Sequence, residues 1–197
     1  MTYIRGDKAE FDAWEAFGNP GWSWDTLYPY FKKVEQFTPP TTAQTDVGAS
    51  YDAKYHGDSG LLKTGFPFQL INGSFNHLVE SAWENLGYSV NPDINSGDVH
   101  GFSMWPQTLD RDANIREDAA RAFLHPVEHR PNLFIIQGTV KRIIWGNYSG
   151  DVTADGFEYL TPDYQTVTIS ASKEVILSAG ALRTPLILEL SGIGNPR

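Results

Sequence analysis

The stretch SAGALRTPLILELSGIG, which runs from Ser178 to Gly194, decides how this sequence is interpreted. The residues that lead into it, KEVILSAG (173–180), form an apolar run of the kind that builds a buried strand. Small residues follow, and a helix is predicted from Thr184 to Leu190 with Pro185 close to its first position. The pattern therefore predicts a strand that turns directly into a helix, whose first N–H groups are open to an acceptor. A tight strand–helix corner that binds nothing is the open alternative.

The last third of the chain is rich in β-type segments. Runs of β-branched and aromatic residues are bounded by Gly, Asn, Asp or Pro, and they are NLFIIQG (132–138), VKRIIWG (140–146), GFEYL (156–160) and QTVTISA (165–171). Together with 173–180 they predict a small, mostly antiparallel β section.

The first two thirds are predicted to hold short helices joined by loops. Two helices are expected on either side of GNPG (18–21), and Ser23 is a plausible N-cap of the second. Its apolar face is predicted to be Leu27, Tyr30, Phe31 and Val34.

Four further segments complete this coarse interpretation. Thr38 to Gly60 is predicted to be a long loop and Leu61 to Phe66 a short strand. Helices are predicted over Asn76 to Leu86, with Gly87 as the C-cap, and over Asn114 to Phe123. The fold class that follows is α+β.

Composition excludes several kinds of partner. The net charge of -9 argues against nucleic acid or an anionic membrane, and no apolar run approaches the length of a membrane span. There is no cysteine, which excludes disulfides and thiolate chemistry. The N-terminus lacks a signal-peptide pattern, although Asn72 and Asn147 begin N-glycosylation sequons.

Two pairs of polar residues have the side-chain types of a metal or acid–base site. His125 and His129 are four residues apart, but Pro126 lies between them and no third ligand is near in sequence, so a metal site is not predicted. Glu117 and Asp118 are adjacent and do not face each other on a helix, which makes paired acid–base chemistry a poor interpretation.

A long pattern at the end of the chain carries a family resemblance. It reads Gly180-Ala181-x-x-Thr184-Pro185-x-Ile187-Leu188-x-x-Ser191-Gly192-Ile193-Gly194, and it resembles the second signature of the glucose–methanol–choline (GMC) flavin oxidoreductases. The opening residues MTYIRG, the segment 93–126 and the segment 130–145 also resemble family segments in the expected order. Similarity is greatest to fungal FAD-dependent glucose dehydrogenases and glucose oxidases.

The resemblance implies that residues 1–197 are an incomplete N-terminal region of a two-domain GMC fold. It would comprise a piece of the FAD-binding α/β domain and part of the substrate domain. No GxGxxG occurs in the sequence, so this cofactor-binding turn would precede residue 1. The catalytic histidine region of the family would follow residue 197, and no catalytic residue is assigned within the chain.

Five positions match family residues that lie against FAD. They are Met1, Thr2, Val140, Ala179 and Gly180. The first two match positions beside the flavin, and Val140 matches a strand residue whose backbone contacts the adenine. Ala179 and Gly180 match small residues that let the strand end approach the cofactor. Arg116, Asp118 and Arg121 are interpreted as structural.

The function implied is that of a segment of an FAD-dependent oxidoreductase acting on CH–OH groups of a sugar or alcohol, inactive as an isolated chain. A complete relative would be secreted. Two alternatives stay open: a truncated, non-catalytic binding protein derived from this family, and an unrelated carbohydrate-binding domain, which the signature disfavours.

Overall fold

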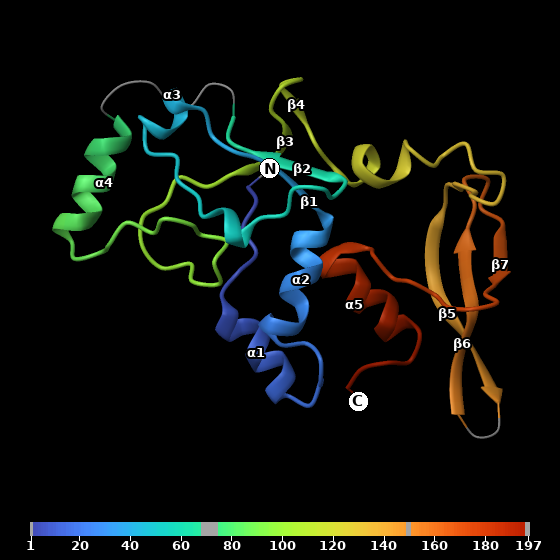
Figure 1. Cartoon of the computed structure of the whole chain (residues 1–197). Coiled ribbons are helices and arrows are strands. Elements are labelled where there is room, and N and C mark those ends of the chain that lie inside the picture. The colour runs from blue at the N-terminus through green and yellow to red at the C-terminus, as the bar shows by residue number, and fades with distance from the viewer. Residues whose placement is uncertain (1, 68–74, 149–150, 196–197) are drawn as a thin grey trace. The chain divides into compact units, whose positions relative to one another are not determined.

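The computed structural model describes residues 2–67, 75–148 and 151–195. The chain forms two compact units, Met1–Arg130 and Pro131–Arg197, which are taken in turn (Figure 1).

The first unit combines short helices with a small sheet. Its α-helices are α1 (Lys8–Ala16), α2 (Trp24–Val34), α3 (Thr42–Thr45) and α4 (Phe75–Asn85); η1 (Ala53–Tyr55) is 3-10 helical and η2 (Ala120–Leu124) is π-helical. Its strands are β1 (Glu35–Thr38), β2 (Leu62–Gly65), β3 (Gln107–Asp110) and β4 (Ile115–Arg116).

The strands of the first unit form one mixed sheet in the order β1-β2-β3-β4. Strand β1 runs parallel to β2, with Glu35 opposite Leu62, whereas β2–β3 and β3–β4 are antiparallel. Between β3 and β4 the chain reverses through Asn114, whose φ of 53° is the left-handed conformation that asparagine tolerates.

Two apolar groups hold the first unit together. Phe37, Ala49 and Phe66 form a buried cluster, with Met104 packed against it. In the other group the ring of Trp24 stacks on Tyr28 at 5.4 Å between centroids and meets the rings of Phe11 and Phe31 at 5.6 and 6.1 Å. This second group joins α1 to α2.

The second unit is an antiparallel sheet with one helix. Strands β5 (Thr139–Tyr148), β6 (Asp151–Leu160) and β7 (Thr166–Ser170) lie in that order, and helix α5 (Gly180–Leu190) follows. The β5–β6 pairing shifts register between Val140 and Arg142 and again between Ile144 and Trp145.

Much of the predicted structure is confirmed. The α+β class, the two helices around residues 18–21, the strand within Leu61 to Phe66 and the helix over Asn76 to Leu86 are all present. Gly87 ends that last helix with a φ of 90°. The runs 140–146, 156–160 and 165–171 contribute to β5, β6 and β7.

The predicted helix over Asn114 to Phe123 is wrong in its first half. Asn114 lies in the turn before β4, and helical structure begins only at Ala120. The Asp110 side chain accepts the backbone N–H of Ala113, and the Arg111 carbonyl accepts that of Asn114, so these bonds close the turn. The long loop over Thr38 to Gly60 likewise contains the short helices α3 and η1.

The apolar face predicted for α2 is also partly wrong. Tyr30 is 62% exposed and Val34 is 38% exposed, while Trp24 is buried instead. The face of α2 that packs against α1 carries Trp24, Tyr28 and Phe31, because the ring of Phe11 on α1 contacts Trp24 and Phe31 and the ring of Trp24 stacks on Tyr28.

The runs 132–138 and 173–180 do not form the predicted strands. Residues 132–138 and 174–178 have no strand pairing in the described part of the chain. Phe134 is 81% exposed and Ile176 is 74% exposed, so the buried strand expected before the terminal turn is wrong for this chain. A strand forms only with a hydrogen-bonded neighbour, and β5, β6 and β7 pair with one another without including these runs.

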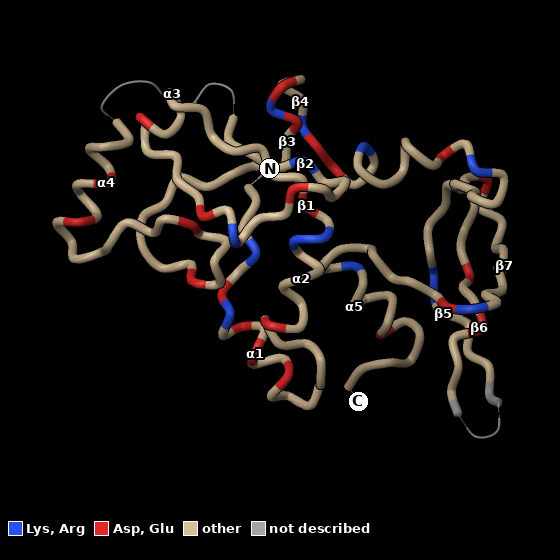
Figure 2. Tube along the Cα trace, in the orientation of Figure 1, with Lys and Arg blue, Asp and Glu red and all other residues tan. Residues whose placement is uncertain are grey.

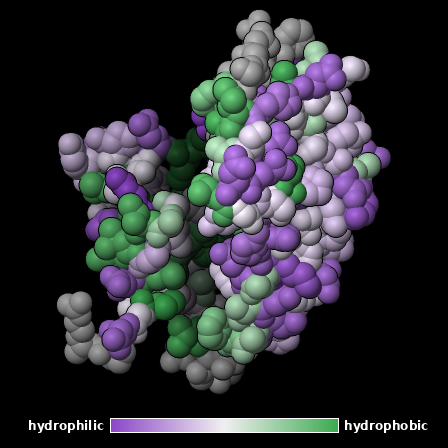
Figure 3. All heavy atoms as spheres, turned by 90° about the vertical axis from the view of Figure 1, so that its left-hand side faces the viewer, coloured by the Kyte–Doolittle hydropathy of each residue, from purple (hydrophilic) through white to green (hydrophobic). Residues whose placement is uncertain are grey.

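The surface is mixed in both charge and polarity. Acidic residues are spread over α1, α4 and the connecting loops; Lys and Arg lie among them in parts of the chain but are absent from α4 (Figure 2). Apolar residues lie at the surface among hydrophilic ones on the face drawn in Figure 3. Among the described helices, none is long and apolar enough to cross a membrane.

Candidate functional site

The terminal turn is built differently from the sequence expectation. Helix α5 begins at Gly180, so Pro185 lies inside the helix rather than at its first position. The backbone N–H of Ala179 donates to the Thr184 hydroxyl at 3.0 Å. Gly180 has a φ of 87°, and apart from its chain neighbours and the backbone of its own helix no heavy atom of the described residues lies within 4 Å of the position that a Cβ would take. The turn is therefore exposed and open.

The other end of α5 is closed by the Ser191-Gly192-Ile193 part of the signature. Gly192, with a φ of 86°, donates to the Glu189 carbonyl at 3.0 Å, and Ile193 donates to the Leu188 carbonyl at 2.9 Å. These two bonds make a Schellman cap, in which glycine accepts the left-handed conformation.

Ser191 ties this helix end to β5. Its hydroxyl oxygen accepts the backbone N–H of Ile143 at 2.8 Å and its O–H donates to the Ile187 carbonyl at 2.6 Å. The Ser191 carbonyl accepts the indole N–H of Trp145 at 2.5 Å. The structural role of this serine was missed in the sequence, although a small polar residue before a helix-ending glycine is a usable signal.

Val140 lies on an accessible strand of the same unit. It pairs with Tyr159, and β5 is an edge strand of the three-stranded sheet, so one row of its backbone groups is unpaired within that sheet. The hydrogen bond from Ile143 to Ser191 joins β5 to the C-terminal end of α5, whereas Ala179 and Gly180 lie at its N-terminal end.

Thr2 lies in the first unit and makes an isolated antiparallel bridge with Gln107. The next residue, Tyr3, donates its backbone N–H to the Pro106 carbonyl at 2.9 Å. Met1 falls outside the described residues. The structure thus brings Ala179 and Gly180 together, places Val140 in the same unit, and places Thr2 in the other.

A buried polar network that sequence reasoning missed begins at Arg5, in the segment that follows Thr2. The carboxylate of Glu35 accepts hydrogen bonds from Arg5 at 2.6 Å, His56 at 3.0 Å and Thr64 at 2.7 Å. His56 also meets Asp93 at 2.9 Å. These residues are widely separated in the sequence, and no local pattern joins them.

The segment around Glu117 forms part of a surface cavity of about 370 Å³. Glu117 is buried and its carboxylate lies 3.5 Å from Nε of Arg121, one turn further on. Lys63, which also lines the cavity, is paired with Asp110, and this hydrogen bond raises the pKa of Lys63. Each of these charges is paired within the unit, which agrees with the structural interpretation of Arg121.

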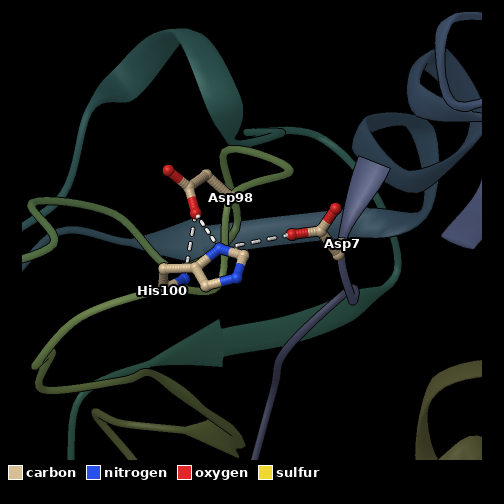
Figure 4. A group of neighbouring side chains, drawn as sticks. All are labelled: Asp7, Asp98 and His100. Atoms are coloured by element: carbon tan, nitrogen blue, oxygen red, sulfur yellow. Dashed lines mark hydrogen bonds and ion pairs between the residues drawn. The ribbon is translucent and has the colours of Figure 1, made fainter. Parts of the chain in front are cut away.

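Asp7, Asp98 and His100 form the one group in the described residues with ligand atoms close enough for a metal ion (Figure 4). Nδ1 of His100 lies 2.8 Å from Asp98 and 3.7 Å from Asp7. Hydrogen bonding to Asp98 raises the pKa of this exposed histidine. Asp98 also accepts the backbone N–H of His100, and Asp7 caps α1. The arrangement is that of a surface ion pair built on a local turn.

Comparisons with known proteins agree with one another. The family model for the N-terminal domain described as GMC oxidoreductase matches residues 1–197. The glucose oxidase-like protein fsoC of Humicola fuscoatra is 55% identical over 187 residues, covering 93% of this chain and 32% of that protein. Glucose oxidase of Penicillium chrysogenum is 35% identical over 98% of this chain and 32% of its own length.

The solved structures give the same result. An FAD-dependent oxidoreductase from Chaetomium thermophilum matches with a TM-score of 0.87 and 36% identity, over 98% of this chain and 33% of that one. The chain therefore spans about a third of the length of the relatives it matches.

Proposed function

The chain belongs to the GMC oxidoreductase family, and we propose that it is the N-terminal FAD-holding part of an enzyme that oxidises a CH–OH group of a sugar or alcohol. The substrate class is taken from the relatives, which include a glucose oxidase. The proposal assigns no catalytic residue to this chain.

The observation that carries the proposal is the open turn at Gly180, inside the stretch that resembles the second family signature. Its left-handed glycine, its empty surroundings and the adjacent first turn of α5 leave room for a ligand to approach the backbone closely. The edge position of β5 supports a backbone contact at Val140. We propose that Ala179, Gly180 and Val140 contact the adenine half of FAD, and that Met1 and Thr2 face the flavin.

The residues present fit part of an FAD site and leave the rest to be supplied. Bound FAD supplies the acceptor for the hydride that leaves the substrate carbon. The residues of this chain would bind FAD and orient it. The turn at Gly180 would allow FAD to approach the backbone closely, and the hydrogen bonds of Ser191 fix α5 against β5.

Exposed apolar runs support the proposal that residues 1–197 are an incomplete N-terminal region. Phe134, Ile135 and Ile176 are 81%, 69% and 74% exposed, which is unusual for side chains of this kind. Helix α5 also exposes Leu182 and Leu190 while it buries Ile187, so it is apolar on more than one side. We propose that these exposed side chains are buried by further chain in the complete protein. That further chain would carry the GxGxxG turn and the catalytic histidine.

Two related predictions remain proposals. The complete enzyme is proposed to be secreted and glycosylated. Asn147 lies near the end of β5, while the Asn72 sequon lies outside the described residues.

The reading frame at the locus is the first test. Long cDNA reads are expected to continue it upstream into a GxGxxG turn and downstream to a late histidine. Mature transcripts bounded at residues 1 and 197 would instead favour the non-catalytic binding protein.

A second test examines the site. In the protein translated from the complete frame, Gly180→Val should lower the ratio of flavin to protein after purification. Gly21→Val is the matched control, because Gly21 also has a positive φ, of 88°, and open space around its Cβ position. Equal flavin ratios in the two variants would refute the assignment of Gly180.

A further inference from the structure

The first unit contains a buried network of charged side chains that is not part of the proposed FAD site. The side chains of Arg5, Glu35, His56 and Asp93 are 1%, 0%, 4% and 3% exposed. Arg5 contacts Glu35 at 2.6 Å, and His56 lies between Glu35 and Asp93. Buried charges are destabilising unless each is paired, so this arrangement depends on its charge balance.

Both ring nitrogens of His56 face a carboxylate oxygen. Nδ1 lies 3.0 Å from Oε1 of Glu35, and Nε2 lies 2.9 Å from Oδ2 of Asp93. An ionised carboxylate can only accept hydrogen bonds, and a neutral imidazole has one donor and one acceptor nitrogen. A neutral His56 would therefore turn a lone pair toward one of the two carboxylates. Only the doubly protonated imidazolium satisfies both contacts.

The charge count leads to the same conclusion. Glu35 and Asp93 contribute two negative charges, and Arg5 contributes one positive charge. The network is neutral only when His56 carries the second positive charge. Loss of that proton would leave a buried carboxylate without a balancing charge.

The rest of the surroundings shields the imidazolium from water. The ring of Phe37 stacks on His56 with centroids 3.8 Å apart and 21° between the planes, and the ring of Tyr51 is 6.2 Å away. Aromatic faces attract a cation, which favours the charged form further.

The other ionisable groups near the network do not replace this charge. They are Tyr3 on the N-terminal segment, Tyr28 on α2, and Asp52, Lys54, Tyr55 and Asp58 on the segment that carries His56. Burial raises the pKa of Tyr3 and of Tyr28, so both phenols stay neutral near pH 8. Lys54 is paired with Asp52 and holds the pKa of that carboxyl below its usual range.

The network joins segments that are distant in the sequence. Arg5 donates from its backbone N–H to Asn95 at 3.0 Å and from its guanidinium to the Tyr55 carbonyl. Asn95 in turn donates to the Tyr3 carbonyl at 3.3 Å. The segment that follows Thr2 is thereby attached to the segments around residues 35, 56 and 93.

We propose that this network is a proton-dependent clamp, in which a doubly protonated His56 holds these four segments together and the clamp weakens as the pH rises. None of the four residues of the clamp is among those that we assign to FAD.

The pH dependence has a defined sign. Burial alone would lower the pKa of His56, but the hydrogen bonds to Asp93 and Glu35 outweigh it and raise the pKa above its ordinary value. A raised folded pKa means that the clamp contributes fully below the unfolded value of about 6.5 and is lost as the pH rises through the folded value. In that window the unfolding equilibrium constant should rise about tenfold per pH unit.

The direct test is nitrogen NMR of the full chain labelled with 15N at histidine. The histidine signal that is absent in the His56→Gln variant should keep both ring nitrogens protonated to a pH above the ordinary histidine value of about 6.5. A single neutral tautomer for His56 at a pH of about 6.5 or below would overturn the proposal.

Unfolding measurements between pH 6 and pH 9 provide the second test. The wild type should lose stability across this range, and His56→Gln should not. Asp93→Asn keeps the ring but removes one carboxylate, so the pH dependence should weaken. His100→Gln is the control, because His100 also pairs with an aspartate but is 85% exposed. A pH dependence in His56→Gln equal to that in the wild type would contradict the clamp.

Discussion

Replacing Ser191 by alanine should loosen the contact between α5 and β5 in the second unit. The hydroxyl oxygen of Ser191 accepts the backbone N–H of Ile143, and the O–H donates to the Ile187 carbonyl. Ser191 is 9% exposed and Ile143 is 6% exposed, so water does not readily replace the lost partner. Alanine leaves the amide of Ile143 buried without this acceptor.

The expected cost follows from that single unpaired donor. A buried N–H that loses its acceptor destabilises a protein by about 1–3 kcal/mol. With a central value of about 2 kcal/mol, local opening should become about 30-fold more frequent, because 1.4 kcal/mol corresponds to a factor of ten.

Amide hydrogen exchange followed by mass spectrometry measures this opening. The peptide that covers β5, residues 139–148, should exchange about 30-fold faster in Ser191→Ala, while peptides from the first unit keep their rates. Ser172→Ala is the matched control, since Ser172 is exposed in the same unit. If both variants exchange alike over 139–148, the Ser191 hydroxyl does not hold the helix to the strand.

The remaining predictions concern other contacts. Glu35→Ala should lower the free energy of unfolding by about 3–5 kcal/mol in urea titrations, since it leaves a buried cation unpaired; a loss below about 1 kcal/mol would contradict this. Gly97→Ala should lower the free energy of unfolding more than Gly87→Ala. Both glycines have a positive φ, of 95° and 90°, but only at Gly97 would a Cβ lie 2.9 Å from the ring of Trp24. Thermal unfolding should show the difference, with about 1–2 kcal/mol for Gly87→Ala, and equal shifts would argue against the clash. Phe134→Asp should raise solubility in light scattering without changing the unfolding midpoint, as its side chain is 81% exposed; a lowered midpoint would mean that it is packed.

Local signals in the sequence were sufficient where neighbouring residues determine the structure. Ser23 occupies the N-cap position of α2, although its side chain makes no capping hydrogen bond. Gly87 follows α4, and the glycine–proline turn separates α1 from α2 as expected. Caps and turns act over a few residues, so a sequence displays them directly. The face of α2 was predicted less well, because Trp24 is buried by contact with α1 rather than by the helix period.

Strand pairing could not be predicted from local pattern. The run 173–180 has the composition of a buried strand, yet it is unpaired in the described chain and Ile176 is exposed. A strand is stable only beside another strand, and the identity of that neighbour is not encoded within the run itself. The assignments of Thr2, Val140, Ala179 and Gly180 to FAD remain predictions, since they rest on a resemblance of sequence and not on an observed contact.

The two ends of the terminal signature differ in what holds them. Ser191 and Gly192 have a structural function that is visible in this chain: they end α5 in a Schellman cap and hydrogen-bond it to β5. Gly180, at the other end of the helix, has a positive φ, and apart from its chain neighbours and its own helix backbone no heavy atom of the described residues lies within 4 Å of its Cβ position, so a packing contact does not account for a glycine there. A positive φ alone favours glycine, but the open space beside it is what a ligand or a further segment would fill. At the C-terminal end of α5 the role of the signature is therefore a set of hydrogen bonds within this chain, whereas at Gly180 the role is the ligand contact that we propose.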